Sequence, residues 1–165
     1  MEHWKRLDEA GFLDYSLSDL GRVRNDRTGR ILRQSPNQFG TYNVGLIRTP
    51  GEGPVTLAVS YTVAQLFLDT PPRPFNSVIH LDGDRGNTRA DNLMWRPRWF
   101  SAKYHKQFAN PPYEFMRELL LVDRDEVYNN AREPAVIYGL LEQDIVESLT
   151  NRKEVWPSGF TFRLI

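Results

Sequence analysis

The chain has 165 residues, of which 40% are hydrophobic and 25% are charged, so it can bury one medium-sized core or two small ones. It contains no cysteine, which excludes a disulfide scaffold and any metal site built from thiolates. No apolar run reaches the length of a transmembrane helix, and the residues from Met1 to Arg6 do not form a signal peptide. We therefore expect no membrane partner and a cytoplasmic location.

Charge is balanced overall but not along the chain. Basic and acidic residues number 21 each. Residues 1–106 carry 15 Lys and Arg against 11 Asp and Glu, a net charge of +4, whereas residues 107–165 carry 6 against 10, a net charge of −4. Contacts to DNA phosphates respond to local charge, so this asymmetry permits a DNA-facing N-terminal part.

The first elements form strands rich in arginine. Tyr15–Asn25 alternates as a strand and turns at Asp19–Gly21, and Thr28-Gly29 is the tip of a further hairpin. Phosphate-binding candidates follow each other here: Arg22, Arg24, Arg27, Arg30 and Arg33. A solvated hairpin surface is the alternative that charge alone favours.

The next segment predicts a hairpin and a helix. Tyr42–Arg48 and Val55–Val59 are the two strands, joined by a loop rich in glycine and proline. Ser60–Leu68 has the apolar spacing of a helix, and the proline-rich residues 70–74 lead away from it.

A strand, a loop, a second strand and a helix are predicted between residues 77 and 108. Val78-Ile79 brings His80 to the end of a strand, and Asp82-Gly83-Asp84 then reverses the chain. Asn92–Trp95 is a short apolar return, and Trp99–Phe108 can be helical. The densest basic cluster lies here and comprises Arg96, Arg98, Lys103 and Lys106.

The C-terminal segment favours helices. The apolar residues of Tyr113–Val122 have the spacing of a helix. Asp125–Tyr128 resembles a short strand, and Phe160–Ile165 resembles a strand at the C-terminal end. A helix from Asn130 to Tyr138 is broken by Gly139 and followed by a second helix over Leu141–Leu149. Two short helices around a glycine suggest a helix-turn-helix, in which Gln143 could contact base edges. Three carboxylates on the second helix make packing or protein contact an equal alternative.

Residues of the central segment carry a family resemblance. Those in register are Val78, His80, Asp82, Gly83, Asn87, Asn92, Leu93 and Trp95. They resemble the HNH, or ββα-metal, motif of phage homing endonucleases, and residues before residue 50 resemble the module that often precedes it. The resemblance implies an α+β fold with an N-terminal antiparallel sheet module over residues 1–70, a ββα motif over 71–110 and a helix-turn-helix-like module over 111–165.

The resemblance also implies roles in the site. His80 matches the general base that activates water, and Asn92 matches the asparagine that holds the loop and orients the histidine. The usual metal-ligand positions are occupied by Ile79 and Ser101, with Tyr104 where a histidine is usual. An aliphatic side chain cannot bind Mg²⁺ or Mn²⁺, so Asp84 and His105 are the alternative ligands.

Three functions remain open from the sequence. The first is an HNH endonuclease that hydrolyses double-stranded DNA with Mg²⁺ or Mn²⁺ in a phage-infected bacterial host. The second is a catalytically silent relative that keeps the fold to bind DNA or a protein such as a polymerase, which the loss of ligands at Ile79 and Ser101 favours. The third is a scaffold or virion component without a nucleic-acid role.

Overall fold

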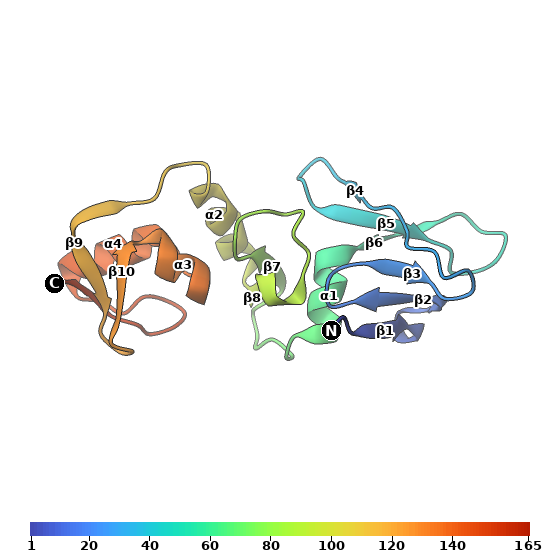
Figure 1. Ribbon diagram of the computed structural model, residues 1–165, viewed down its shortest axis with the longest axis horizontal. Coiled ribbons are helices and arrows are strands. Elements are labelled where there is room, and N and C mark those ends of the chain that lie inside the picture. Colours follow the sequence, from blue (N-terminus) through green and yellow to red (C-terminus); the bar gives the residue numbers. More distant parts are fainter. The chain divides into compact units, whose positions relative to one another are not determined.

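A computed structural model describes all residues, 1–165, and contacts between residues divide them into two compact units. The first unit comprises residues 1–80 and 84–97, and the second comprises residues 81–83 and 98–165. The fold is of the α+β class with antiparallel sheets, as the sequence predicts (Figure 1). The predicted division into three modules, at residues 70 and 110, stays a prediction. The two compact units have other boundaries, at residues 80, 83 and 97.

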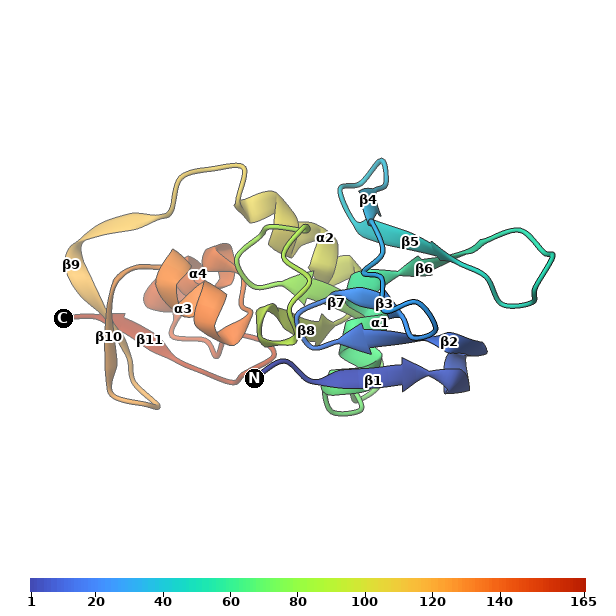
Figure 2. The same cartoon turned by 45° about the vertical axis from the view of Figure 1, so that its right-hand side comes forward.

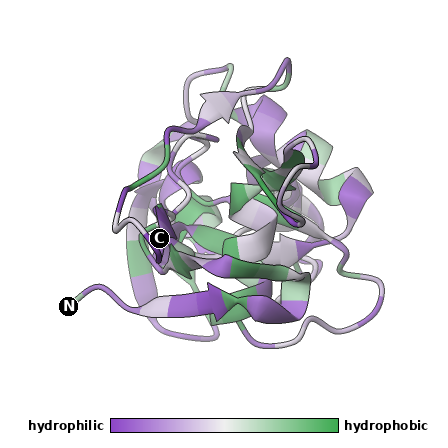
Figure 3. Cartoon of the chain, turned by 90° about the vertical axis from the view of Figure 1, so that its right-hand side faces the viewer, coloured by the Kyte–Doolittle hydropathy of each residue, from purple (hydrophilic) through white to green (hydrophobic).

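The first unit begins with a three-stranded antiparallel sheet. It contains β1 (Trp4–Leu7), β2 (Phe12–Ser18) and β3 (Val23–Asn25), in the order β1-β2-β3. Gly29 has a φ of 71° at the tip of the hairpin that follows β3, as predicted. Figure 3 shows β1, next to the N-terminus, as mostly hydrophilic, in keeping with the exposed side chains of Lys5 and Arg6.

A second sheet and a helix follow. The sheet contains β4 (Ser35–Pro36), β5 (Tyr42–Leu46) and β6 (Val55–Ala58), and the predicted hairpin over β5 and β6 is confirmed. Helix α1 (Val59–Phe67) follows directly and buries Val59, Val63 and Ala64. Lys5 donates a hydrogen bond to the Leu66 carbonyl at the C-terminal end of α1, where a cation complements the helix dipole.

A two-stranded hairpin completes the first unit. It pairs β7 (Ser77–His80) with β8 (Leu93–Arg96), and both strands contact α1 (Figure 2). One hydrophobic core joins these parts, with Leu17, Leu46 and Val63 among its fully buried residues. The core therefore fixes β7, and with it His80, against α1.

The second unit combines three helices with a three-stranded sheet. Its elements are α2 (Arg98–Gln107), β9 (Glu114–Leu121), β10 (Glu126–Asn130), α3 (Arg132–Tyr138), α4 (Glu142–Asn151) and β11 (Phe162–Leu164). The strand order is β10-β9-β11, all antiparallel. Leu119, Leu121 and Ile145 are fully buried in a separate core.

One predicted element is wrong. Residues 113–122 do not form a helix, because Glu114–Leu121 is strand β9, which pairs with β10 on one side and β11 on the other. The other elements predicted in this region are confirmed, and Gly139 ends α3 in the left-handed conformation. None of the helices combines the length and the apolar composition that crossing a bilayer requires.

Candidate functional site

His80 is the last residue of β7 and forms a buried polar pair with α1. It lies opposite Leu93 in the hairpin, and the residue is only 3% exposed. The Nε2 atom of His80 lies 2.8 Å from the hydroxyl oxygen of Ser60, a distance typical of a hydrogen bond. Since Ser60 is also buried, this hydroxyl satisfies a ring nitrogen that burial would otherwise penalise.

The pair fixes the orientation of the imidazole. Either the hydroxyl donates to Nε2 or Nε2–H donates to the hydroxyl, and in both tautomers the ring is tied to α1. Nothing in the sequence around His80 indicates this contact, because Ser60 lies 20 residues earlier and on another element. The only available signal was the place of Ser60 in the first turn of a predicted helix.

Asn92 ties the loop between the two strands. Its Nδ2 atom donates a hydrogen bond to the Asn87 carbonyl at 2.9 Å, and Asn92 immediately precedes Leu93, the residue paired with His80. Asp84 shapes the start of the same loop, where its Oδ1 atom accepts a hydrogen bond from the Gly86 amide at 2.8 Å. The predicted loop-holding geometry of Asn92 is therefore present, while its catalytic role stays a prediction.

Gly83 is required by the geometry of its own unit. Its φ is 78°, and a Cβ atom placed on it would lie 2.4 Å from the ring of Phe108. Both the left-handed backbone and the missing space exclude a larger side chain. This agrees with the turn that the sequence predicts at this position.

The residues at the expected cation positions do not fit a divalent metal. Ile79 is fully buried and offers no oxygen or nitrogen, and Ser101 is 7% exposed. His105 brings its Nδ1 atom within 2.9 Å of the Ser101 carbonyl, which can only accept, so Nδ1 carries a proton. No group of three His, Asp or Glu side chains lies together where it could hold a metal ion.

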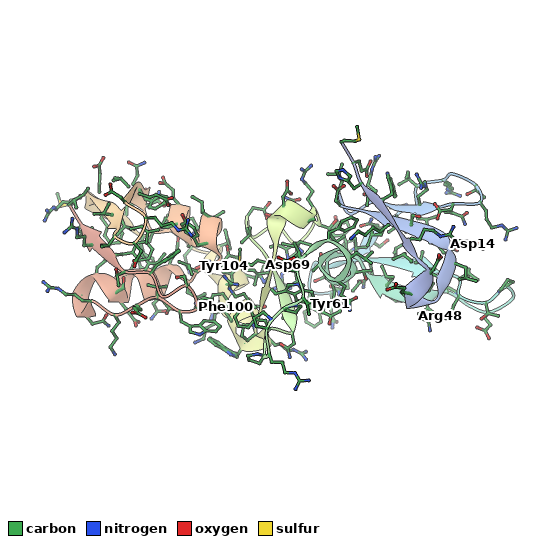
Figure 4. All side chains as sticks on the ribbon, turned by 90° about the horizontal axis from the view of Figure 1, so that it is seen from below. Asp14, Arg48, Tyr61, Asp69, Phe100 and Tyr104 are labelled. Carbon is green, nitrogen blue, oxygen red and sulfur yellow. The ribbon has the colours of Figure 1, made fainter.

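Helix α2 separates its apolar residues from its basic residues. Phe100 and Tyr104, both labelled in Figure 4, are buried, and the Tyr104 hydroxyl donates a hydrogen bond to the Leu81 carbonyl at 2.7 Å. Arg98, Lys103 and Lys106 are exposed. No Asp or Glu occurs between Asp91 and Glu114, so α2 presents cations without any acidic residue of its own.

Acidic side chains of α4 lie near α2. Asp144, on α4, has its pKa raised above the usual value by burial and by the neighbouring Glu147, while the charge of Lys103 opposes this rise. Arg96, predicted as part of the same basic cluster, is only 7% exposed. Its Nη1 atom donates to the Trp95 carbonyl at 2.8 Å, and its guanidinium lies over the Phe75 ring. Phosphate contact is therefore better supported for Arg98, Lys103 and Lys106 than for Arg96.

The arginines of the N-terminal hairpin are mostly paired on the surface. Arg22 binds Glu2 and holds the pKa of that carboxyl below its usual value, and Arg24 lies 3.0 Å from Asp26. Arg27 reaches Asp14 more loosely, at 3.7 Å. Exposed pairs of this kind contribute little stability, so a phosphate could replace the carboxylate. Arg30 and Arg33, the two remaining candidates, are exposed and form no ion pair.

Gln143 is exposed on α4 and is engaged along its own helix. Its Nε2 atom donates to Glu147 at 3.0 Å. Because the first turn of α4 also carries Glu142 and Asp144, this helix has the acidic character noted from the sequence. Base reading by Gln143, and a helix-turn-helix function for α3 and α4, stay predictions.

Sequence comparisons relate the chain to known proteins. Residues 2–47 match the NUMOD4 motif, which is associated with HNH endonucleases. Two proteins of Acanthamoeba polyphaga mimivirus, each named an uncharacterized HNH endonuclease, are 33% identical over 92 residues and 34% identical over 95 residues. These matches cover 56% and 57% of this chain but 26% and 23% of the relatives, so the chain spans about a quarter of their length. The phage host implied by the resemblance stays a prediction.

A solved structure shares the fold. The structure described as DNA binding and cleavage by the HNH homing endonuclease I-HmuI matches with a TM-score of 0.54 and 20% sequence identity. The match covers 99% of this chain and 98% of that chain. The N-terminal motif, the named relatives and the shared fold together confirm that this chain resembles the HNH endonucleases.

Proposed function

We propose that this chain binds double-stranded DNA through the exposed cations of α2. The observation that carries the proposal is the composition of this helix, whose apolar residues are buried while Arg98, Lys103 and Lys106 are exposed without an acidic residue between Asp91 and Glu114. Cations concentrated in this way neutralise phosphates and release counterions, which makes binding favourable and dependent on salt. The fold shared with a DNA-binding and DNA-cleaving endonuclease supports the same partner.

The N-terminal hairpin supplies further candidate contacts. Arg30 and Arg33 are exposed without a carboxylate partner. Arg22 and Arg24 pair with Glu2 and Asp26, and each can exchange that carboxylate for a DNA phosphate. Such contacts position a protein on DNA but do not read its sequence. Binding of a protein partner, by contrast, has no observation in its favour.

Binding is better supported than cleavage. His80 is 3% exposed, and the neighbouring Ile79 places a buried aliphatic side chain at an expected ligand position. A phosphodiesterase must bring its base to water and stabilise the charge that develops on the phosphate. The residues present favour a scaffold that holds DNA, with hydrolysis as the second candidate.

Salt-dependent binding tests the first candidate. Lys103→Gln/Lys106→Gln removes two cations from α2, and Lys153→Gln/Arg163→Gln removes two exposed cations elsewhere in the second unit. We expect the α2 variant to bind a labelled duplex about 10-fold more weakly near 0.1 M salt and to lower the salt slope by about 2, whereas the control changes little. Fluorescence anisotropy measures both. Equal losses in the two variants, or binding by the wild type that ignores salt, would contradict the proposal.

Hydrolysis is a second candidate because of the Ser60–His80 hydrogen bond. An imidazole fixed by a buried hydroxyl is suited to take the proton from water while the water oxygen bonds to phosphorus. The bond from phosphorus to the leaving sugar oxygen then breaks, and solvent protonates that oxygen. Asn92 holds the loop that precedes the strand paired with His80. A plasmid-nicking assay with Mg²⁺ or Mn²⁺ tests this by comparing wild type with His80→Ala. Nicking by the wild type alone supports this role of His80. Nicking by both proteins excludes it, and nicking by neither leaves DNA binding as the function.

A further inference from the structure

Two exposed tryptophans form a pair beside the first turn of α2. Trp99 is 56% exposed and Trp156 is 41% exposed, which is unusual for side chains of this size. Their ring centroids are 5.2 Å apart with an interplanar angle of 34°. The buried ring of Phe100 contacts both, with centroid distances of 5.7 Å to Trp99 and 5.4 Å to Trp156. The exposed indoles therefore rest on the buried ring of Phe100.

One cation adjoins this pair. Lys103 lies one helical turn after Trp99 and places its Nζ atom 5.6 Å from the centroid of the Trp99 ring. This contact favours one orientation of the indole and keeps an ammonium next to its face. Arg98 and Lys106 are exposed on the same helix, and Asp144 is the carboxylate whose charge interacts with Lys103. The surface combines a flat apolar area with positive charge.

A nucleotide has the complementary chemistry. Its base offers a π-face that stacks on an indole, and its phosphate offers the negative charge that an adjacent lysine binds. We propose that Trp99, supported by Trp156, stacks on an unpaired base of the DNA bound by α2, with Lys103 contacting the phosphate of that nucleotide. The inference rests on the proposed DNA binding. The lack of acidic residues between Asp91 and Glu114 favours this polyanion over a protein partner.

The inference goes beyond phosphate contact because it specifies the state of the base. In a continuous duplex both faces of each base are stacked on neighbours, so an indole gains access only where a base is unpaired or extruded. We therefore expect the chain to prefer a bulged base over a bulge of equal charge that lacks the base.

A matched pair of duplexes tests this expectation. Both carry one central bulged nucleotide, which is thymidine in one duplex and an abasic residue in the other, so that charge and length are equal. By anisotropy titration we expect wild type to bind the thymidine bulge on the order of 10-fold more tightly than the abasic bulge. Trp99→Leu should bind both duplexes alike, whereas Trp99→Phe keeps a ring and should keep most of the preference.

The remaining outcomes separate stacking from simple charge. Lys103→Gln should weaken binding to both duplexes while leaving the preference in place, because it removes a phosphate contact and not the ring. A wild type that binds both duplexes equally, or a preference that survives in Trp99→Leu, overturns the inference while leaving DNA binding intact. Failure of the wild type to bind either duplex rejects the proposed function and this inference with it. Circular dichroism confirms folding of Trp99→Leu, whose substituted side chain is largely exposed.

Discussion

At the scale of single residues, one buried hydroxyl explains how His80 is held. Ser60 and His80 are 2% and 3% exposed, so neither polar atom of the pair can turn to bulk water. The partner of His80 comes from α1, 20 residues earlier in the sequence. The sequence suggests His80 as a candidate site residue, but it could not identify Ser60 as its partner, because the pair depends on how α1 packs against β7.

Removing that hydroxyl should destabilise the first unit. Ser60→Ala leaves the Nε2 atom of His80 buried without this partner, and we expect the free energy of unfolding to fall by about 1–3 kcal/mol. Urea unfolding followed by circular dichroism measures the change. The control Ser35→Ala alters an exposed serine and should stay within about 0.5 kcal/mol of wild type. Equal stability of Ser60→Ala and wild type would show that the hydrogen bond contributes nothing.

At the scale of elements, Arg132 joins the end of α2 to α3 and α4. Its Nη2 atom donates to the Gln107 and Asn110 carbonyls at 3.0 Å each, and its guanidinium pairs with Glu142. The Glu142 side chain is only 3% exposed and the Arg132 side chain 15% exposed, so this ion pair is screened little by water. A cation at the C-terminal end of α2 also complements the helix dipole. Helix α2 is thereby fixed to the rest of its own unit.

Breaking this pair from one side should be costly. We expect Arg132→Met to lower the free energy of unfolding by about 3–5 kcal/mol, because it leaves the Glu142 carboxylate buried and unpaired. The double variant Arg132→Met/Glu142→Gln removes that charge as well and should recover part of the loss. Urea titrations of wild type, both single variants and the double variant form a complete cycle. Additive losses would mean that the two side chains do not interact.

Strand β9 shows where element prediction from the sequence ends. Phe115, Leu119 and Val122 are spaced as on a helix, and the segment is rich in residues that favour helices. The segment nevertheless forms the central strand of its sheet, because pairing on both sides with β10 and β11 outweighs local preference. Elements bounded by strong turn signals, such as α3 before Gly139, were predictable because their boundaries are local. The Trp99–Trp156 contact was not, since it joins residues far apart in the sequence.

At the scale of the whole molecule, the basic and acidic residues are concentrated on different elements, although their total charge is zero. The net charge of zero combines a basic stretch that includes α2 with an acidic C-terminal stretch that includes α4. Binding to a polyanion depends on the charges within about 10 Å, the screening distance at 0.1 M salt, and not on the sum over the chain. A protein with no net charge can therefore bind a polyanion through one basic helix, which is the arrangement that the proposed DNA binding requires.

Two separate cores imply two units that open independently. Leu17 lies in the core of the first unit and Ile145 in that of the second, and both are fully buried. Leu17→Ala and Ile145→Ala should each cost about 2–5 kcal/mol through the cavity that they leave. Because cooperative opening follows the local core, we expect Ile145→Ala to speed amide hydrogen exchange in β9, β10 and β11 while β1, β2 and β3 keep their protection. Leu17→Ala should produce the opposite pattern. Faster exchange throughout the chain in both variants would instead mean that the molecule unfolds as one cooperative unit, and that neither core stabilises its own elements alone.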